Sequence, residues 1–321
     1  MPDPGIDFLL TFGPCPANAF LLNMSRFYQK FCTVILALLV AATAVSGSEI
    51  ESRLKLELGE GDFPGGPYCM AVGADGALFV LDQGRAVLHR ISPETGEMIW
   101  RIDGSESGQP FIDPAYISRP DGFFIYLTDR GSRKVWRIDY RGEIRGNIDL
   151  AFATDPVLLD LTSGSQMVLY DRAASAIHLL DDSGRPLWSF PTGAGRKTGE
   201  PADLCVSPDG SRLYLLWSDP PAVVSFNIYG RTSSSLPLPI ESISPRLLAA
   251  AVLTGGGEAL CLADGAGAVL VLDPLSGSVA ELPATGEKIW DIRAAPDDPG
   301  TLYMLAGKQV ALIKIKLETG N

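Results

Sequence analysis

The chain has 321 residues, of which 46 % are hydrophobic and 20 % are charged, a composition that excludes intrinsic disorder, a collagen-like fibre and a multi-span membrane protein. Its 38 acidic and 26 basic residues give a formal net charge of −12. Because phosphate backbones repel such an acidic chain and no basic stripe offsets the charge, nucleic acid is not expected as a partner.

A candidate export signal occupies residues 24–47, where two cations precede an apolar core that ends near Val45 and is followed by small residues. This three-part layout is typical of a secretory signal peptide, and the apolar core is shorter than the roughly 20 residues that a membrane span needs. We therefore expect an exported protein, periplasmic or extracellular, in which residues 1–23 are an unstructured or mis-assigned extension. The alternative is an uncleaved N-terminal anchor, which would be the chain's one contact with a membrane.

Residues 48–321 are predicted to form a single domain built from six copies of one unit. The first copy contains PYCMAVGADGALFVLDQG, residues 67–84, in which an Asp75-Gly76 turn separates two apolar strands. The next four copies begin with the same X-Pro pattern, and the opening prolines are 47, 42, 45 and 44 residues apart, at Pro67, Pro114, Pro156, Pro201 and Pro245. Repeats of this length indicate a solenoid, an array or a propeller.

Each copy contains four short strands, A to D, and no segment after residue 48 has the 3.6-residue periodicity of a helix. Four-stranded units of this size are typical of β-propeller blades. The sixth copy ends after strand C at Ile313–Leu317, whereas the alternating segment Glu51–Leu58 precedes the first copy without a partner. We therefore predict an all-β, six-bladed β-propeller with four-stranded blades, in which this N-terminal strand completes the last blade and closes the ring.

The opening proline, the Asp-Gly turn and the run Leu78–Asp82 resemble the NHL-type repeat of six-bladed propellers. The resemblance extends over nearly all of residues 51–321, although the Asn-His-Leu triplet that names the repeat is absent from every copy. It implies a propeller fold with ligand or partner binding on one face, and it does not imply a particular chemistry.

Few features of the sequence are typical of catalysis. The two histidines, His89 and His178, fall in strand C patterns of non-adjacent blades, where packing is the expected role, and no metalloprotease, thiol-redox or nucleophile-elbow motif occurs. Three cysteines follow the signal and lie in apolar strands: Cys69, Cys205 and Cys261. We expect them to be buried free thiols; the alternative is that two of them form a disulfide. No catalytic residue and no cofactor are predicted.

Carboxylates precede three of the opening prolines, at Asp113, Asp155 and Glu200. Strand A lines the channel of a propeller, so these carboxylates would surround the channel mouth, with Asp203 and Asp291 nearby. Clustered oxygen ligands of this kind are what Ca²⁺ or another divalent cation requires. Such a site resembles the metal site of gluconolactonase-like propellers, but their ligands include asparagines, and strand A has none here. The competing interpretation is that these acids cap turns and face water.

The loops between strands B and C open on the same face as the connections between blades. Arg and Trp are enriched where proteins bind partners, and we select as candidate binding residues Arg85, Arg130, Arg133, Arg172, Trp217 and Asp219. For any one of them a solvated loop position is the simpler interpretation. Trp188 lies in a strand pattern and is expected in the core.

These observations predict an exported, non-catalytic binding or scaffold protein that holds a protein, peptide or glycan on the face formed by these loops. The alternative is a metal-dependent hydrolase or lyase, similar to lactonases, with its site at the channel mouth.

Overall fold

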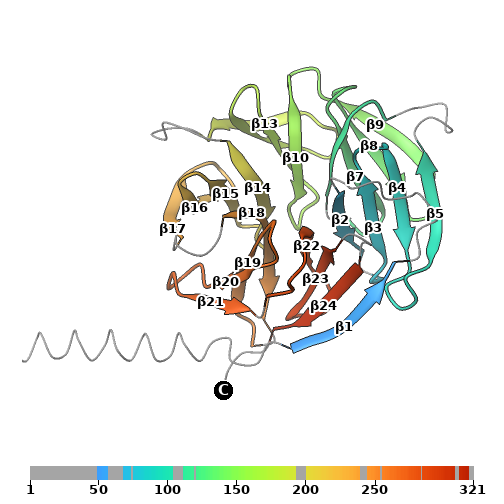
Figure 1. The fold of residues 1–321 in the computed structure, drawn as a ribbon. Coiled ribbons are helices and arrows are strands. Elements are labelled where there is room, and N and C mark those ends of the chain that lie inside the picture. Colours follow the sequence, from blue (N-terminus) through green and yellow to red (C-terminus); the bar gives the residue numbers. More distant parts are fainter. Residues whose placement is uncertain are drawn as a thin grey trace, which may run out of the picture.

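The computed structural model describes residues 49–56, 68–73, 75–103, 111–118, 121–192, 200–238, 244–253, 255–282, 284–307 and 311–317. Within these ranges the chain forms 24 strands in six four-stranded antiparallel sheets, arranged as the blades of a β-propeller (Figure 1). The predicted fold class is therefore confirmed. The segments proposed at residues 1–23 and 24–47 lie outside the described residues, within which no helix is long and apolar enough to cross a bilayer.

Blades 1 to 3 are each a meander of four consecutive strands, with the first strand at the channel and the fourth at the periphery (Figure 1). Blade 1 comprises β2 (Tyr68–Val72), β3 (Leu78–Asp82), β4 (Val87–Ile91) and β5 (Met98–Asp103). Blade 2 comprises β6 (Pro114–Ile117), β7 (Phe124–Asp129), β8 (Lys134–Asp139) and β9 (Ile144–Asp149). Blade 3 comprises β10 (Pro156–Leu161), β11 (Met167–Asp171), β12 (Ala176–Leu180) and β13 (Pro186–Pro191).

Blades 4 and 5 repeat this order, and blade 6 differs in its outer strand. Blade 4 comprises β14 (Pro201–Val206), β15 (Arg212–Ser218), β16 (Pro221–Asn227) and β17 (Thr232–Pro237). Blade 5 comprises β18 (Pro245–Val252), β19 (Glu258–Asp264), β20 (Val269–Leu272) and β21 (Val279–Leu282). Blade 6 comprises β22 (Ile289–Ala294), β23 (Thr301–Ala306), β24 (Ala311–Lys316) and β1 (Glu49–Lys55).

The hydrophobic core lies between successive blades rather than within any one of them. All five side chains of β3 are buried: Leu78 and Val80 pack in a cluster with residues of blade 6, whereas Phe79 and Leu81 pack in a cluster with residues of blade 2. Burying one such side chain contributes about 1.5–3 kcal/mol. Because both faces of a middle strand are buried, its sequence is a continuous apolar run instead of an alternating one.

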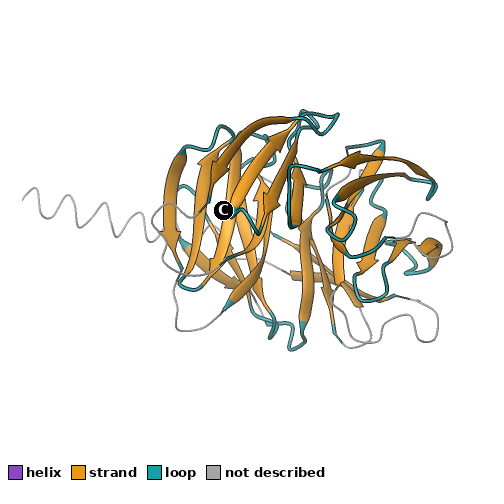
Figure 2. Ribbon diagram, turned by 90° about the horizontal axis from the view of Figure 1, so that it is seen from above, coloured by secondary structure: helices purple, strands orange, loops and turns teal. Residues whose placement is uncertain are grey.

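The antiparallel order of the strands divides the connections between two faces of the ring (Figure 2). The turns from strand A to B and from C to D lie on one face, here named the lower face. The B–C loops and the connections between blades lie on the other, the upper face. Several lower-face turns depend on glycine, as at Gly76 and Gly210, whose φ angles of 76° and 75° belong to the left-handed region.

Strand β1 occupies the outer position of blade 6. It pairs antiparallel with β24, from Glu49 opposite Lys316 to Lys55 opposite Ala311. Leu54 and Leu56 pack in the cluster that joins blade 6 to blade 1. The first and last strands of the described chain therefore lie side by side (Figure 1). How far this pairing stabilises the ring is a prediction that deletion of β1 can test.

Candidate functional site

β-Bulges at the start of the inner strands shape the centre of the propeller. In blades 2 to 6 the register of strand A against strand B shifts just after the opening residue, between Pro114/Tyr116, Pro156/Leu158, Pro201/Asp203, Pro245/Leu247 and Ile289/Asp291. A bulge re-aims side chains next to it. As a result two successive residues of one strand line the same cavity, as Ala202 and Asp203 do, and likewise Trp290 and Asp291.

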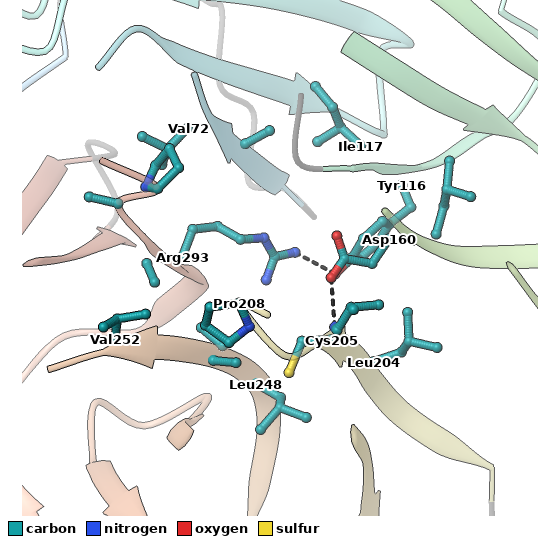
Figure 3. A pocket seen from close by; sticks show the side chains of 18 residues that line it. Val72, Tyr116, Ile117, Asp160, Leu204, Cys205, Pro208, Leu248, Val252 and Arg293 are labelled. Carbon is teal, nitrogen blue, oxygen red and sulfur yellow. Dashed lines mark hydrogen bonds between the residues drawn. The ribbon is translucent and has the colours of Figure 1, made fainter. Parts of the chain in front are cut away.

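Two cavities occupy the channel. The upper cavity, of about 540 Å³, is bordered by blade connections and B–C loop residues such as Asp113 and Arg130. The lower cavity, of about 140 Å³, lies among the inner strands and is lined by apolar residues together with Asp160, Tyr116 and Arg293 (Figure 3). Tyr116 and Arg293 line both cavities. These two side chains therefore separate the upper cavity from the lower one.

A cluster of four side chains, here named the channel plug, lies at this level: Tyr116, Asp203, Asp291 and Arg293. The Arg293 Nη1 atom lies 3.0 Å from Asp291 Oδ1 and 3.8 Å from Asp203 Oδ2. Arg293 Nη2 donates to the Tyr116 hydroxyl, which in turn donates to Asp203 Oδ1 at 2.9 Å. Asp203 and Asp291 are only 2 % and 1 % exposed, so their charges depend on these partners rather than on water.

Carboxylates of the inner strands also join three of the blades to the blade that follows. The backbone N–H of Val206 donates to Asp160 Oδ2 at 2.7 Å, and that of Leu248 donates to Asp203 Oδ2 at 2.9 Å. The third such bond runs from the Met70 N–H in blade 1 to Asp291 in blade 6. At the lower cavity Arg293 is hydrogen-bonded to the Tyr116 hydroxyl, and Asp160 accepts the bond from Val206 (Figure 3).

Burial perturbs the acidity of the plug. Desolvation raises the pKa of Asp291 to about 7; the Arg293 charge acts to lower it and the Asp203 charge raises it further. Desolvation also raises the pKa of Asp203, against the opposing effect of Arg293. The phenol of Tyr116 has its pKa raised well above the ordinary value for the same reason.

The raised pKa of Asp291 predicts a pH-dependent stability. Between the ordinary value of 3.8 and about 7 the folded protein retains a proton that the unfolded chain releases. The contribution of Asp291 to the unfolding free energy is therefore largest below pH 3.8 and falls as the pH rises to 7, by up to about 1.4 kcal/mol per pH unit.

Asp291→Asn removes this titration, so the stability of the native protein relative to the variant is expected to decrease across that pH range. Urea unfolding of both proteins at several pH values from about 4.5 to 8 measures the difference. A difference that stays constant with pH would contradict the assignment.

The structure pairs two of the candidate arginines with two of the candidate metal ligands. Arg130 contacts the Asp113 carboxylate through both Nε and Nη2, and Arg172 Nε donates to Asp155 at 2.7 Å. These two arginines therefore have a local structural role, since each holds the residue before an opening proline. Among the described residues no group of three or more His, Cys, Asp or Glu side chains is placed to hold a metal ion.

The other predicted site residues are dispersed. Arg85, Arg133 and Asp219 are exposed in B–C loops, and Glu200 is exposed just before blade 4 and does not line the upper cavity. The placement of Trp217 in a loop is corrected: it lies inside β15 and is 2 % exposed, because it packs in the core between blades 3 and 4. A side chain buried in this way has no surface to offer a partner.

Trp188 shows the opposite error, since it lies in the outer strand β13 and is 54 % exposed. Tyr116 and Arg293 are not among the site residues predicted from the sequence. Arg293 was nevertheless detectable, because it follows Asp291 by two residues in an otherwise apolar strand, and residues at this spacing share a face.

No protein-family model matches the chain, and no curated protein matches it in sequence. Its fold is similar to solved structures, among them a streptogramin B lyase, with a TM-score of 0.58 and 13 % identity over 85 % of this chain and 98 % of the other. A catalytically inactive His-to-Ala variant of virginiamycin B lyase from Staphylococcus aureus, with quinupristin, has a TM-score of 0.56 and 18 % identity over 78 % of this chain and 80 % of the other. Hydrazine synthase of Kuenenia stuttgartiensis has a TM-score of 0.54 and 18 % identity over 80 % of this chain and 77 % of the other.

At these identities the likeness establishes the β-propeller fold alone. The fold implied by the NHL-type resemblance is therefore present, whereas membership of that repeat family stays a prediction.

Proposed function

We propose that the protein is an exported, non-catalytic binding protein that holds part of a protein, peptide or glycan in the upper cavity. The observation that carries this proposal is the cavity itself, which measures about 540 Å³ and combines apolar walls with charged groups. Ligand sites in proteins typically have this size and this mixed lining. The channel plug ends the cavity at its base, so a ligand would enter from the upper face and stop at Tyr116 and Arg293.

The state of the polar groups supports binding rather than catalysis. Asp203 and Asp291 accept backbone N–H groups and contact Arg293, so the carboxylates at the base of the cavity already have structural roles. The similar virginiamycin B lyase is described as inactive when a histidine is replaced. In this chain His89 is 1 % exposed, and neither His89 nor His178 lines a channel cavity.

One observation favours a second candidate, an enzyme of the hydrolase or lyase class. Asp291 lines the upper cavity, and its pKa of about 7 is suited to a general acid or base at neutral pH. A metal-dependent version would need Asp113, Asp155 or Glu200 as ligands. Thermal unfolding after chelation and re-addition of Ca²⁺, Mg²⁺ or Zn²⁺ tests it: a rise in Tm that Asp113→Ala or Glu200→Ala abolishes would favour this candidate over simple binding.

Blocking the upper cavity is expected to abolish binding without unfolding the protein. Ala202 lines the cavity and is partly exposed, so Ala202→Arg places a long side chain in the volume that a ligand would fill. A thermal-shift screen of defined peptides and oligosaccharides identifies ligands. At 100 times its Kd a ligand stabilises by about 2.7 kcal/mol, a shift of roughly 5 °C or more, and Ala202→Arg should remove that shift.

The matched control is Leu275→Arg, which adds the same side chain at a lower-face turn where Leu275 is 79 % exposed. This variant should respond to each ligand as the native protein does. Ligands that stabilise Ala202→Arg and the native protein equally would contradict binding in the upper cavity.

A further inference from the structure

A third cavity, of about 710 Å³, lies away from the channel at the rim of the upper face, where β1 meets blade 6. We name it the rim cavity. The described residues that line it are Arg53, Lys55, Gly286, Glu287, Lys288, Ala306, Gly307 and Ala311. None of these residues lines the upper cavity.

The alternation of β1 explains one wall of the rim cavity. Residues two apart on a strand share a face, with Cα atoms about 7 Å apart, so Arg53 and Lys55 point the same way. Leu54 and Leu56 point the other way, into the cluster with blade 1. The apolar face of β1 is thus used in packing, and its cationic face is directed into the cavity.

The opposite wall comes from the connection into blade 6 and the end of β23. Glu287 receives Arg53 as an ion-pair partner, and a Cβ at Gly307 would lie only 2.6 Å from Glu287 Oε2. Gly307 also has a φ of 82°, in the left-handed region that favours glycine. Lys288 is exposed, and its Nζ lies 3.4 Å from the centroid of the Trp290 ring.

The charge of the rim cavity is opposite to that of the protein. The described residues of its lining include three cations, Arg53, Lys55 and Lys288, and one carboxylate, Glu287, in a chain whose formal net charge is −12. Only Arg53 has that carboxylate as a partner. Lys55 and Lys288 lie on opposite walls, and among the described residues neither has a carboxylate partner, so both charges face a common volume.

We propose that the rim cavity binds an anionic oligomer that carries at least two carboxylate, sulfate or phosphate groups. One group pairs with Lys55 on β1 and another with Lys288 on the blade connection, so the ligand bridges the N-terminal strand and the last blade. Charge-assisted contacts of this kind are stronger than neutral hydrogen bonds and weaken with added salt. The site exists only when β1 is paired with β24.

Isothermal titration calorimetry with three probes tests the proposal: a uronic acid trisaccharide, tripolyphosphate and a neutral trisaccharide of the same length. At least one anionic probe is expected to bind the native protein, and the neutral sugar is not. Lys55→Ser and Lys288→Ser should each weaken that binding about tenfold or more. The tighter of the two anionic probes identifies the source of the negative groups, sugar carboxylate or phosphate.

Two matched variants remove the same charge elsewhere, because Arg141 and Arg231 are exposed on lower-face turns. Arg141→Ser and Arg231→Ser should bind the probe within twofold of the native protein, as should the channel variant Ala202→Arg. Failure of both anionic probes to bind would overturn the proposal. Equal weakening in all four serine variants would also overturn it, since that result reports only the overall charge of the protein.

Discussion

Replacing Arg293 with methionine is expected to lower the free energy of unfolding by about 3–5 kcal/mol, the usual cost of removing one partner from a buried ion pair. Arg293 is the one cation of the channel plug, and its side chain contacts both Asp203 and Asp291. Methionine has a similar length, so the variant removes the charge while leaving little empty volume. Urea unfolding of the two proteins near pH 9, well above the pKa of about 7 that Asp291 has in the native protein, measures the loss.

A second substitution distinguishes lost charge from lost packing. In Arg293→Met combined with Asp291→Asn, one of the two uncompensated carboxylates becomes a neutral amide. The double variant should therefore be more stable than the sum of the single effects predicts, with a coupling of about 1 kcal/mol or more. Additive effects would mean that the plug does not act as an electrostatic unit. A loss below about 1 kcal/mol in Arg293→Met alone would contradict its stabilising role.

Deleting β1 is the second large effect that we expect. A chain that begins at residue 57 should be less stable than one that begins at residue 48 by about 5 kcal/mol or more. Leu56 is 4 % exposed and Leu54 packs beside it, and truncating a buried leucine alone costs about 2–5 kcal/mol. The deletion also uncovers the edge of β24, which exposes an unpaired row of backbone groups to aggregation.

Point variants and rescue make this result specific. Leu56→Ala should cost about 2–5 kcal/mol, whereas Ser52→Ala, at an exposed position of the same strand, should stay within about 0.5 kcal/mol. A synthetic peptide covering residues 48–58 should raise the melting temperature of the shortened chain. If the shortened chain melts at the same temperature as the longer one, β1 does not stabilise the ring.

The fold was predictable because its determinants are local and repeated. The Asp75-Gly76 turn and the apolar run Leu78–Asp82 specify two strands without reference to the rest of the chain, and the repeat supplies their partners. Trp188 was predicted in the core and is exposed, whereas Trp217 was predicted in a loop and is buried. A single aromatic residue carries no periodic signal that would indicate which side of the strand is covered. Their burial depends on the neighbouring blade, which sequence spacing alone does not specify.

The candidate site was predictable only in part. Asp113 lines the upper cavity, whereas Asp155 does not. Their partners Arg130 and Arg172 lie 17 residues away and were interpreted separately. The channel plug joins Tyr116 to Arg293 across 177 residues. Contacts at such separations arise from the circular arrangement of the blades, and no local pattern in the sequence encodes them.

The pairing of β1 with β24 has a consequence for biosynthesis. Lys314 and Glu51 form an ion pair across the two strands and are 263 residues apart in the chain. Strand β1 is therefore synthesised long before β24, the strand with which it pairs. During that interval its backbone is open to pairing with other chains, and contacts so distant in sequence form slowly. The charges of Arg53 and Lys55 would hinder the β1 strands of two nascent chains from pairing with one another.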